Sequence, residues 1–166
     1  MTKARCVCRC LLALGLILFP AQLQAQLLSG ITLSFASVSG SVPLSGAGTD
    51  TATLNFGTVS AFAPLTSGAT RSSSGSSYTV STNFGVRTTK NLVGLLSPNY
   101  TLRARLQSAH VLTWRVNGTT LSTTDAIVGT SQPYGTAVSH NLSFVVPFSQ
   151  AAGPVTAVLE ITAIAN

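Results

Sequence analysis

The chain has 166 residues, of which 45% are hydrophobic and only 7% are charged, and its net charge is +6. So few charges exclude a disordered chain, which needs high net charge and low hydrophobicity. They also exclude a charged coiled coil and a strongly basic nucleic-acid-binding protein, and the length indicates one domain rather than two.

The first 25 residues have the three parts of a secretory signal peptide. Three basic residues precede an apolar run over residues 10–19, which is too short to span a bilayer. Pro20 ends the run, and Ala25 supplies a small residue at the expected cleavage position. We therefore expect export to the periplasm, the cell surface or the extracellular space, with a mature domain over residues 26–166.

Cleavage after Ala25 would change the charge and remove every cysteine. Lys3, Arg5 and Arg9 would leave, which lowers the net charge from +6 to +3. The three cysteines at positions 6, 8 and 10 would leave with them, so the mature chain could form no disulfide, although an exported compartment permits one. Stability must then come from a buried core, which a domain of 141 residues can provide.

Alternation of apolar and polar residues predicts β-strands throughout the mature chain, and no stretch has a helical period. The predicted strands are residues 31–38, 51–59, 77–87, 99–107, 111–116, 119–121, 142–146 and 155–163. Turn-rich segments are predicted between them at residues 39–49, 66–77 and 129–135. Short strands without helices predict one antiparallel β-sandwich of Ig-like type, and an up-and-down barrel is the alternative.

The alternation also assigns faces to the strands. The residues expected to face the core include Tyr78, Val80, Phe84 and Val86 on one strand and Tyr100, Leu102, Ala104 and Leu106 on the next. The clearest local signal is a hairpin, because Asn117-Gly118 separates the strands at 111–116 and 119–121. A type I′ turn needs positive φ at both central residues, and Asn-Gly adopts that conformation readily.

The mature chain has few groups able to perform chemistry. Its only acids are Asp50, Asp125 and Glu160, and its only histidines are His110 and His140, which we expect partly exposed at strand starts. A Ser-His-Asp triad can be composed from Asp125 and His140, but no Gly-x-Ser-x-Gly motif surrounds a serine. No metal-ligand spacing or phosphate-binding loop is present. The sequence predicts a non-enzyme with no catalytic residue, cofactor or metal.

Three arginines form a candidate basic patch. Arg103 and Arg105 share the polar face of one predicted strand, and Arg115 lies on another that could be its neighbour. Such a patch could bind acidic polysaccharide, lipid headgroups or nucleic acid. We favour an ordinary solvated strand face, because the mature charge excess is small and no aromatic residue lies among the arginines. We expect no nucleic-acid partner.

The first predicted strand allows another function. Ile31, Leu33 and Phe35 alternate with polar residues directly after the cleavage site, so residues 26–40 are a candidate donor segment. A mobile apolar strand at a terminus suits β-strand addition, in which it completes the sheet of a neighbouring molecule. Pairing within its own sandwich is the alternative, and the sequence leaves both open.

Three stretches carry a family resemblance. Residues 54–59 read Leu-Asn-Phe-Gly-Thr-Val, residues 142–146 form an apolar strand, and residues 151–162 form a glycine-led strand of alternating threonine and valine. They resemble, in that order, an early, the penultimate and the last strand of the spore coat protein U and archaic chaperone–usher pilin group. With the signal peptide and the chain length, the resemblance covers most of the mature chain.

The resemblance implies an incomplete Ig-like sandwich, passed by a periplasmic chaperone to an outer-membrane usher and completed by a neighbour's N-terminal strand. Ile31, Leu33 and Phe35 would then be donor-strand residues. The candidates for lining the acceptor groove are Val155, Leu159 and Ile161.

We therefore expect an exported structural subunit of a surface or pilus-like assembly, a fimbrium for example, joined by β-strand complementation. Its partners would be further copies or related subunits, and no membrane span would remain after signal cleavage. The alternative is a self-contained periplasmic or secreted binding module for a glycan or protein ligand, with loops such as residues 66–77 forming its site.

Overall fold

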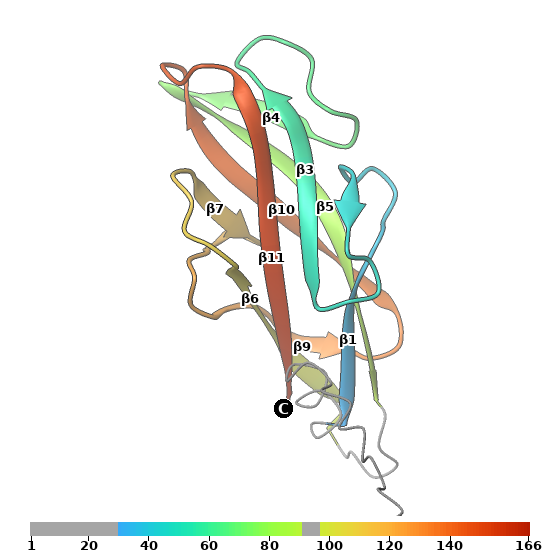
Figure 1. Cartoon of the computed structure of the whole chain (residues 1–166). Helices are drawn as coiled ribbons and strands as arrows, with labels where there is room; N and C mark the ends of the chain where they lie inside the picture. The colour runs from blue at the N-terminus through green and yellow to red at the C-terminus, as the bar shows by residue number, and fades with distance from the viewer. Residues whose placement is uncertain (1–29, 91–96) are drawn as a thin grey trace, which may run out of the picture.

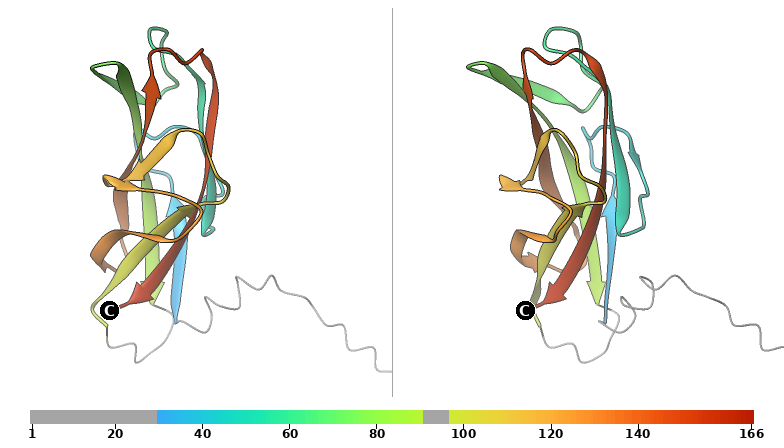
Figure 2. Two further views of the ribbon diagram at one scale, coloured as in Figure 1. Left: turned by 90° about the vertical axis from the view of Figure 1, so that its left-hand side faces the viewer. Right: turned by 60° about the vertical axis from the view of Figure 1, so that its left-hand side comes forward.

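The computed structural model describes residues 30–90 and 97–166, so the predicted signal peptide lies outside the described residues. Within these ranges the chain forms eleven strands and no helix, and therefore contains no helix able to cross a membrane. The strands make two antiparallel sheets that pack face to face (Figures 1 and 2). The predicted β-sandwich is confirmed, and the alternative barrel is wrong.

Sheet A and sheet B each have a continuous strand order. Sheet A contains, in spatial order, β1 (Ile31–Ala36), β5 (Ser77–Lys90), β10 (Ala137–Pro147), β7 (Thr113–Val116) and β8 (Thr119–Thr120), and β4 (Thr70–Ser74) also pairs with β5. Sheet B contains β2 (Leu44–Ser45), β3 (Thr51–Val59), β11 (Gly153–Ala165), β6 (Asn99–Leu106) and β9 (Ala126–Pro133). Each of the eight predicted strands overlaps one of these.

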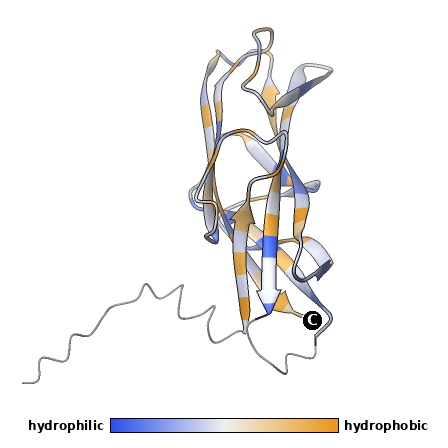
Figure 3. Cartoon of the chain, turned by 90° about the vertical axis from the view of Figure 1, so that its right-hand side faces the viewer, coloured by the Kyte–Doolittle hydropathy of each residue, from blue (hydrophilic) through white to orange (hydrophobic). Residues whose placement is uncertain are grey.

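The core lies between the sheets and has an aromatic centre. Phe56 of sheet B lies 4.9 Å from Phe144 and 5.7 Å from Trp114 of sheet A, measured between ring centroids, and all three side chains are buried. The residues that alternation assigned to the core on β5 and β6 are all buried as well. Figure 3 shows the alternation as orange and paler bands along the strands. Rings in edge-to-face and tilted contact stabilise such a core beyond the area they bury.

The predicted hairpin is confirmed. Asn117 and Gly118 have φ values of 49° and 85°, and Val116 pairs with Thr119, so the loop has two residues. These angles are those of the type I′ turn, whose twist matches the twist of the flanking strands.

Two segments that were predicted as turns form strands. β4 lies within residues 66–77 and pairs with β5 through a turn at Gly75-Ser76, and β9 includes most of residues 129–135. Nearly every residue of β4 is exposed, so no apolar alternation marks it. β9 pairs with β6 through two register shifts, and Ser131 has a positive φ of 52°, which interrupts its alternation.

Two strands share one edge of β5. β4 pairs with Ser77–Ser81 and β1 pairs with Gly85–Lys90. Between these two stretches, the buried Thr82 hydroxyl accepts a hydrogen bond from Val42 N (3.0 Å) and donates one to Gly68 O (2.9 Å). The loop backbone at Val42 and Gly68 therefore packs against β5 at the position between these two strands.

Candidate functional site

β1 pairs in cis and lies at the edge of sheet A (Figure 1). Its six residues run antiparallel to β5 of the same chain, from Ile31 opposite Lys90 to Ala36 opposite Gly85. The candidate donor residues Ile31, Leu33 and Phe35 all point inward and are buried. They are core residues of their own sandwich in this structure.

The segment that precedes β3 hydrogen-bonds to the outer edge of β1 at Phe35. Phe35 N donates to Thr49 O (2.8 Å), and Gly48 N donates to Phe35 O (2.9 Å). Alternate residues of an antiparallel strand direct their backbone groups to opposite edges. Phe35 therefore bonds away from β5, and its ring packs inward at 5.5 Å from Phe84 between centroids.

The candidate acceptor residues belong to the opposite sheet. Val155, Leu159 and Ile161 lie on β11 and are buried in the core, and β11 contacts β1 across the sandwich. β11 is an inner strand, because β3 pairs along one side of it and β6 along the other. The edge that β1 occupies belongs to β5, so the donor and acceptor candidates share a core but are not neighbours in one sheet.

The strand order explains how β11 is covered. β1, β5, β10 and β7 follow the A-B-E-D order of an immunoglobulin sandwich, and β11 and β6 take the places of strands F and C. The place of strand G beside F is taken by β3, which comes from the N-terminal part of the chain and runs antiparallel to β11. β3 begins at Thr51, and directly before it Asp50 O accepts a hydrogen bond from Ile161 N (2.9 Å).

The two histidines differ in their surroundings, and the expectation that both are partly exposed at strand starts is wrong for His140. His140 is 2% exposed within β10, whereas His110 is exposed before β7 and accepts a hydrogen bond from Leu112 N (3.0 Å). Burial is favoured here because His140 shares the inward parity of Leu142. In the described residues, neither imidazole has a carboxylate partner.

Asn117 fixes the protonation state of His140. The Asn117 Oδ1 atom accepts a hydrogen bond from Asn141 N (3.0 Å), which orients the amide. Its Nδ2 group then donates to Val128 O (2.8 Å) and to His140 Nδ1 (2.9 Å). Because Nδ2 only donates, Nδ1 carries no proton and the imidazole is neutral. Burial lowers the pKa of His140, which favours the same state.

The three arginines of the candidate patch do not share a face, because Arg115 lies in a different sheet from Arg103 and Arg105. Arg103 and Arg105 project from β6 on the outer face of sheet B. Arg115 projects from β7 on the outer face of sheet A, where it lies opposite Ser143 and Thr120. The sequence could not show this, because alternation gives the face of a strand but not the sheet to which it belongs.

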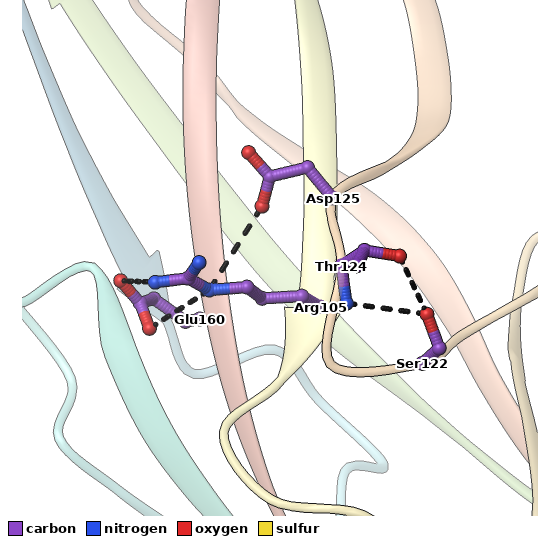
Figure 4. A network of polar contacts seen from close by, with 5 residues as sticks. All are labelled: Arg105, Ser122, Thr124, Asp125 and Glu160. Carbon is purple, nitrogen blue, oxygen red and sulfur yellow. Dashed lines mark hydrogen bonds and ion pairs between the residues drawn. The ribbon is translucent and has the colours of Figure 1, made fainter.

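Arg105 is engaged in an ion-pair network (Figure 4). Its Nε and Nη2 groups donate to the two carboxylate oxygens of Glu160 at 3.1 and 2.8 Å, and Nε lies 3.9 Å from Asp125 Oδ1. The hydrogen bond to Glu160 raises the pKa of Arg105. Ser122 and Thr124 bond to each other beside it at 2.8 Å between their hydroxyls. The network joins β6, β11 and the connection before β9, and so neutralises much of the charge expected for a patch.

The described residues contain no group of three or more metal-ligating side chains. Comparisons with protein-family models, with curated proteins and with solved structures give no match. Of the candidate donor strand, acceptor residues, histidines and arginines, the donor strand β1 bears most directly on a function, because it lies at a sheet edge.

Proposed function

We propose that the chain is an exported structural subunit of a surface or pilus-like assembly, in which β1 pairs with β5 of a neighbouring copy. One observation carries the proposal. β1 is the first described strand, lies at a sheet edge and pairs with β5 along its length, its one strand partner among residues 30–90 and 97–166. A terminal edge strand of this kind can be exchanged between copies while every contact is kept.

Burial of β1 supplies the driving force for pairing in either arrangement. Without β1, the edge of β5 would border an apolar groove that Ile31, Leu33 and Phe35 now fill. Burying each such side chain is worth about 1.5–3 kcal/mol. A chain with this groove empty would aggregate, because it exposes an apolar surface and an open strand edge. The groove must therefore be filled by the chain's own β1, by a neighbour's β1 or by a chaperone.

The connection after β1 is the hinge that exchange requires. Ser41 donates to Val38 O through its backbone N (3.3 Å) and its Oγ (2.6 Å), in a turn where Gly40 has a φ of 77°. Opening this turn would extend residues 37–43 and direct β1 away from its own sandwich. Short hinge connections favour exchange of this type.

Export and assembly partners belong to the same proposal. The predicted signal peptide over residues 1–25 supports export, and the resemblance of residues 54–59, 142–146 and 151–162 to pilin strands supports assembly. On this proposal a periplasmic chaperone covers the groove beside β5 until an outer-membrane usher delivers the neighbouring subunit.

Disulfide trapping tests the exchange. Ser34 on β1 and Arg87 on β5 are paired opposite each other and point outward. One chain carrying Ser34→Cys and another carrying Arg87→Cys are produced together and oxidised. Exchange should give covalent heterodimers on a non-reducing gel, and the double variant should give a ladder.

A mixture of Ser34→Cys with Thr113→Cys should give no covalent dimer on the same gel, because Thr113 lies on β7, two strands beyond β5. If the double variant closes its disulfide only within one chain and the mixture yields no dimer, β1 stays in cis and the strand-exchange proposal is wrong.

A self-contained binding module is the second candidate, and the cis pairing of β1 favours it. With β1 on β5 and β3 on β11, one chain forms both sheets without help from a second copy. Such a module would be a stable monomer, and its ligand site would lie on the connections at one end of the sandwich. The segment expected to supply that site, residues 66–77, is largely the β4–β5 hairpin.

A further inference from the structure

Two exposed aromatic side chains lie together on connections at the end of the sandwich opposite β1. Phe62, on the connection from β3 to β4, is 89% exposed, and Phe148, between β10 and β11, is 37% exposed. Their rings are nearly parallel, with an angle of 17° between the planes and 6.3 Å between centroids. We call this pair the aromatic ledge. Large exposed apolar side chains that gather in this way mark binding sites more often than scattered ones do.

The loop that carries Phe62 is held in place although Phe62 contributes little buried surface. Arg71 on β4 donates to the carbonyls of Ser60 (3.0 Å), Ala61 and Ala63 (2.6 Å). The Ser60 hydroxyl in turn accepts hydrogen bonds from Phe62 N and Ala63 N, both at 3.3 Å. One guanidinium and one hydroxyl therefore fix the loop. A side chain presented on a fixed loop loses little entropy when it binds a ligand.

Phe148 is also fixed. Its backbone N donates to Ser76 O (3.0 Å), and its ring lies 5.4 Å from the buried ring of Tyr78 between centroids. The Arg71 guanidinium lies 5.8 Å from the centre of the same tyrosine ring. The two halves of the ledge therefore share one support, formed by Arg71 and Tyr78.

A small hollow lies at the base of the two connections that carry the ledge. Its volume is about 40 Å³, and Val59, Val146, Gln150, Ala151 and Gly153 are among its lining residues. Pockets for drug-sized ligands span about 300–1,000 Å³, so this hollow is too small for a sugar ring and has room only for a group the size of a hydroxyl.

The charges of this region indicate a neutral ligand. None of the residues that line the hollow or form the ledge is charged, and the guanidinium of Arg71 is occupied by three carbonyls. A protein partner is disfavoured by area, because a stable interface needs about 800 Å² from each partner and the ledge offers two side chains. A sugar ring combines an apolar C–H face, which packs on aromatic rings, with hydroxyl groups that hydrogen-bond to amides.

We propose that the aromatic ledge binds a sugar ring of a neutral glycan. The site does not depend on how β1 pairs. Figure 1 shows β1 at the lower end of the sandwich and the connections that carry Phe62 and Phe148 at the upper end, so exchange of β1 would leave the ledge intact. No sequence pattern indicated this site, since Phe62 and Phe148 lie in connections where no period assigns a role.

The test uses the full exported chain and a panel of neutral polysaccharides: mannan, laminarin, xylan and dextran. Retardation in native gels containing each polymer identifies a ligand, and calorimetric titration with a hexasaccharide of that polymer gives its affinity. Phe62→Ala should weaken the affinity by about tenfold, the loss expected for one aromatic contact. Its thermal midpoint should not change, because the side chain is exposed. Phe62→Trp should retain binding.

Two further variants separate the ledge from general surface effects. Val111→Ala removes another exposed apolar side chain, 94% exposed and outside the ledge, and should leave the affinity unchanged. Arg71→Lys keeps the charge but cannot bind three carbonyls in the same geometry, so it should weaken the affinity by loosening the Phe62 loop.

Three outcomes would overturn the proposal. Failure of every polysaccharide in the panel to retard the chain rules out a neutral-glycan site, and unchanged affinity in Phe62→Ala removes the ledge from it. If Phe62→Ala instead lowers the mass of the particle measured by light scattering, the ledge is a contact between copies.

Discussion

His140 lies between the sheets with Nδ1 bonded to Asn117 and with no partner for Nε2 among the described residues. A proton on Nδ1 would face the donating amide of Asn117, and the resulting charge would be buried. Both effects favour the neutral imidazole, so the folded protein binds a proton at His140 less readily than the unfolded chain does.

This difference predicts a pH dependence of stability. Burial lowers the pKa of His140 below its ordinary value of 6.5. The free energy of unfolding should therefore be constant with respect to His140 above pH 6.5 and should decline as the pH falls below it, because the unfolded state then binds the extra proton. Urea unfolding at several pH values between 5 and 8 measures the slope.

Two variants show which histidine causes this slope of the unfolding free energy with pH. His140→Gln should remove it, and His110→Gln, which changes the exposed histidine, should retain it. An equal slope in the wild-type protein and in His140→Gln would mean that His140 is not the group responsible.

At the scale of the element, the edge of β5 depends on tight loop packing. Gly68 has a φ of 86°, and a Cβ there would lie 2.3 Å from both the carbonyl carbon and the carbonyl oxygen of Ser41. The same segments hold Thr82 between β4 and β1. Two backbone segments cannot separate without breaking those bonds, so this glycine is required by space as well as by conformation.

Gly68→Ala should therefore lower the free energy of unfolding by more than the roughly 1–2 kcal/mol that a left-handed alanine costs. Gly48→Ala is the matched control, because Gly48 has a similar φ of 89° and open space around its Cβ position. Chemical denaturation of both variants isolates the effect of the contact with Ser41. An equal loss of unfolding free energy in the two variants would show that the loops around Gly68 shift easily to accommodate the added methyl group.

At the scale of the whole molecule, one six-residue strand determines whether the sandwich is complete. β1 supplies an edge of sheet A and three buried side chains, and it contacts β11 across the core. A chain that begins at Ser37 should expose the groove beside β5 and aggregate, because neighbouring copies then offer each other open edges.

A synthetic peptide of residues 29–38 tests whether β1 can act from outside the chain. Added during refolding, it should restore a soluble particle with a cooperative thermal transition, whereas the peptide with Leu33→Asp should not, since it places a charge in the core. If the truncated chain folds with an unchanged thermal midpoint, β1 is dispensable and cannot be the element that joins subunits.

The sequence by itself determined the sandwich, the inward residues of β5 and β6 and the turn at Asn117-Gly118. These features follow from local interactions. Buried residues alternate with exposed ones along the sequence of each strand, and Asn-Gly readily adopts positive φ. The exposed β4 and the irregular β9 show no such alternation in the sequence. Only the tertiary structure decided that β1 pairs with β5, that β3 covers β11, that Arg115 and Arg105 belong to different sheets, and that Phe62 and Phe148 meet. Each of these depends on contacts between segments far apart in the chain, and alternation along one strand does not specify its partner.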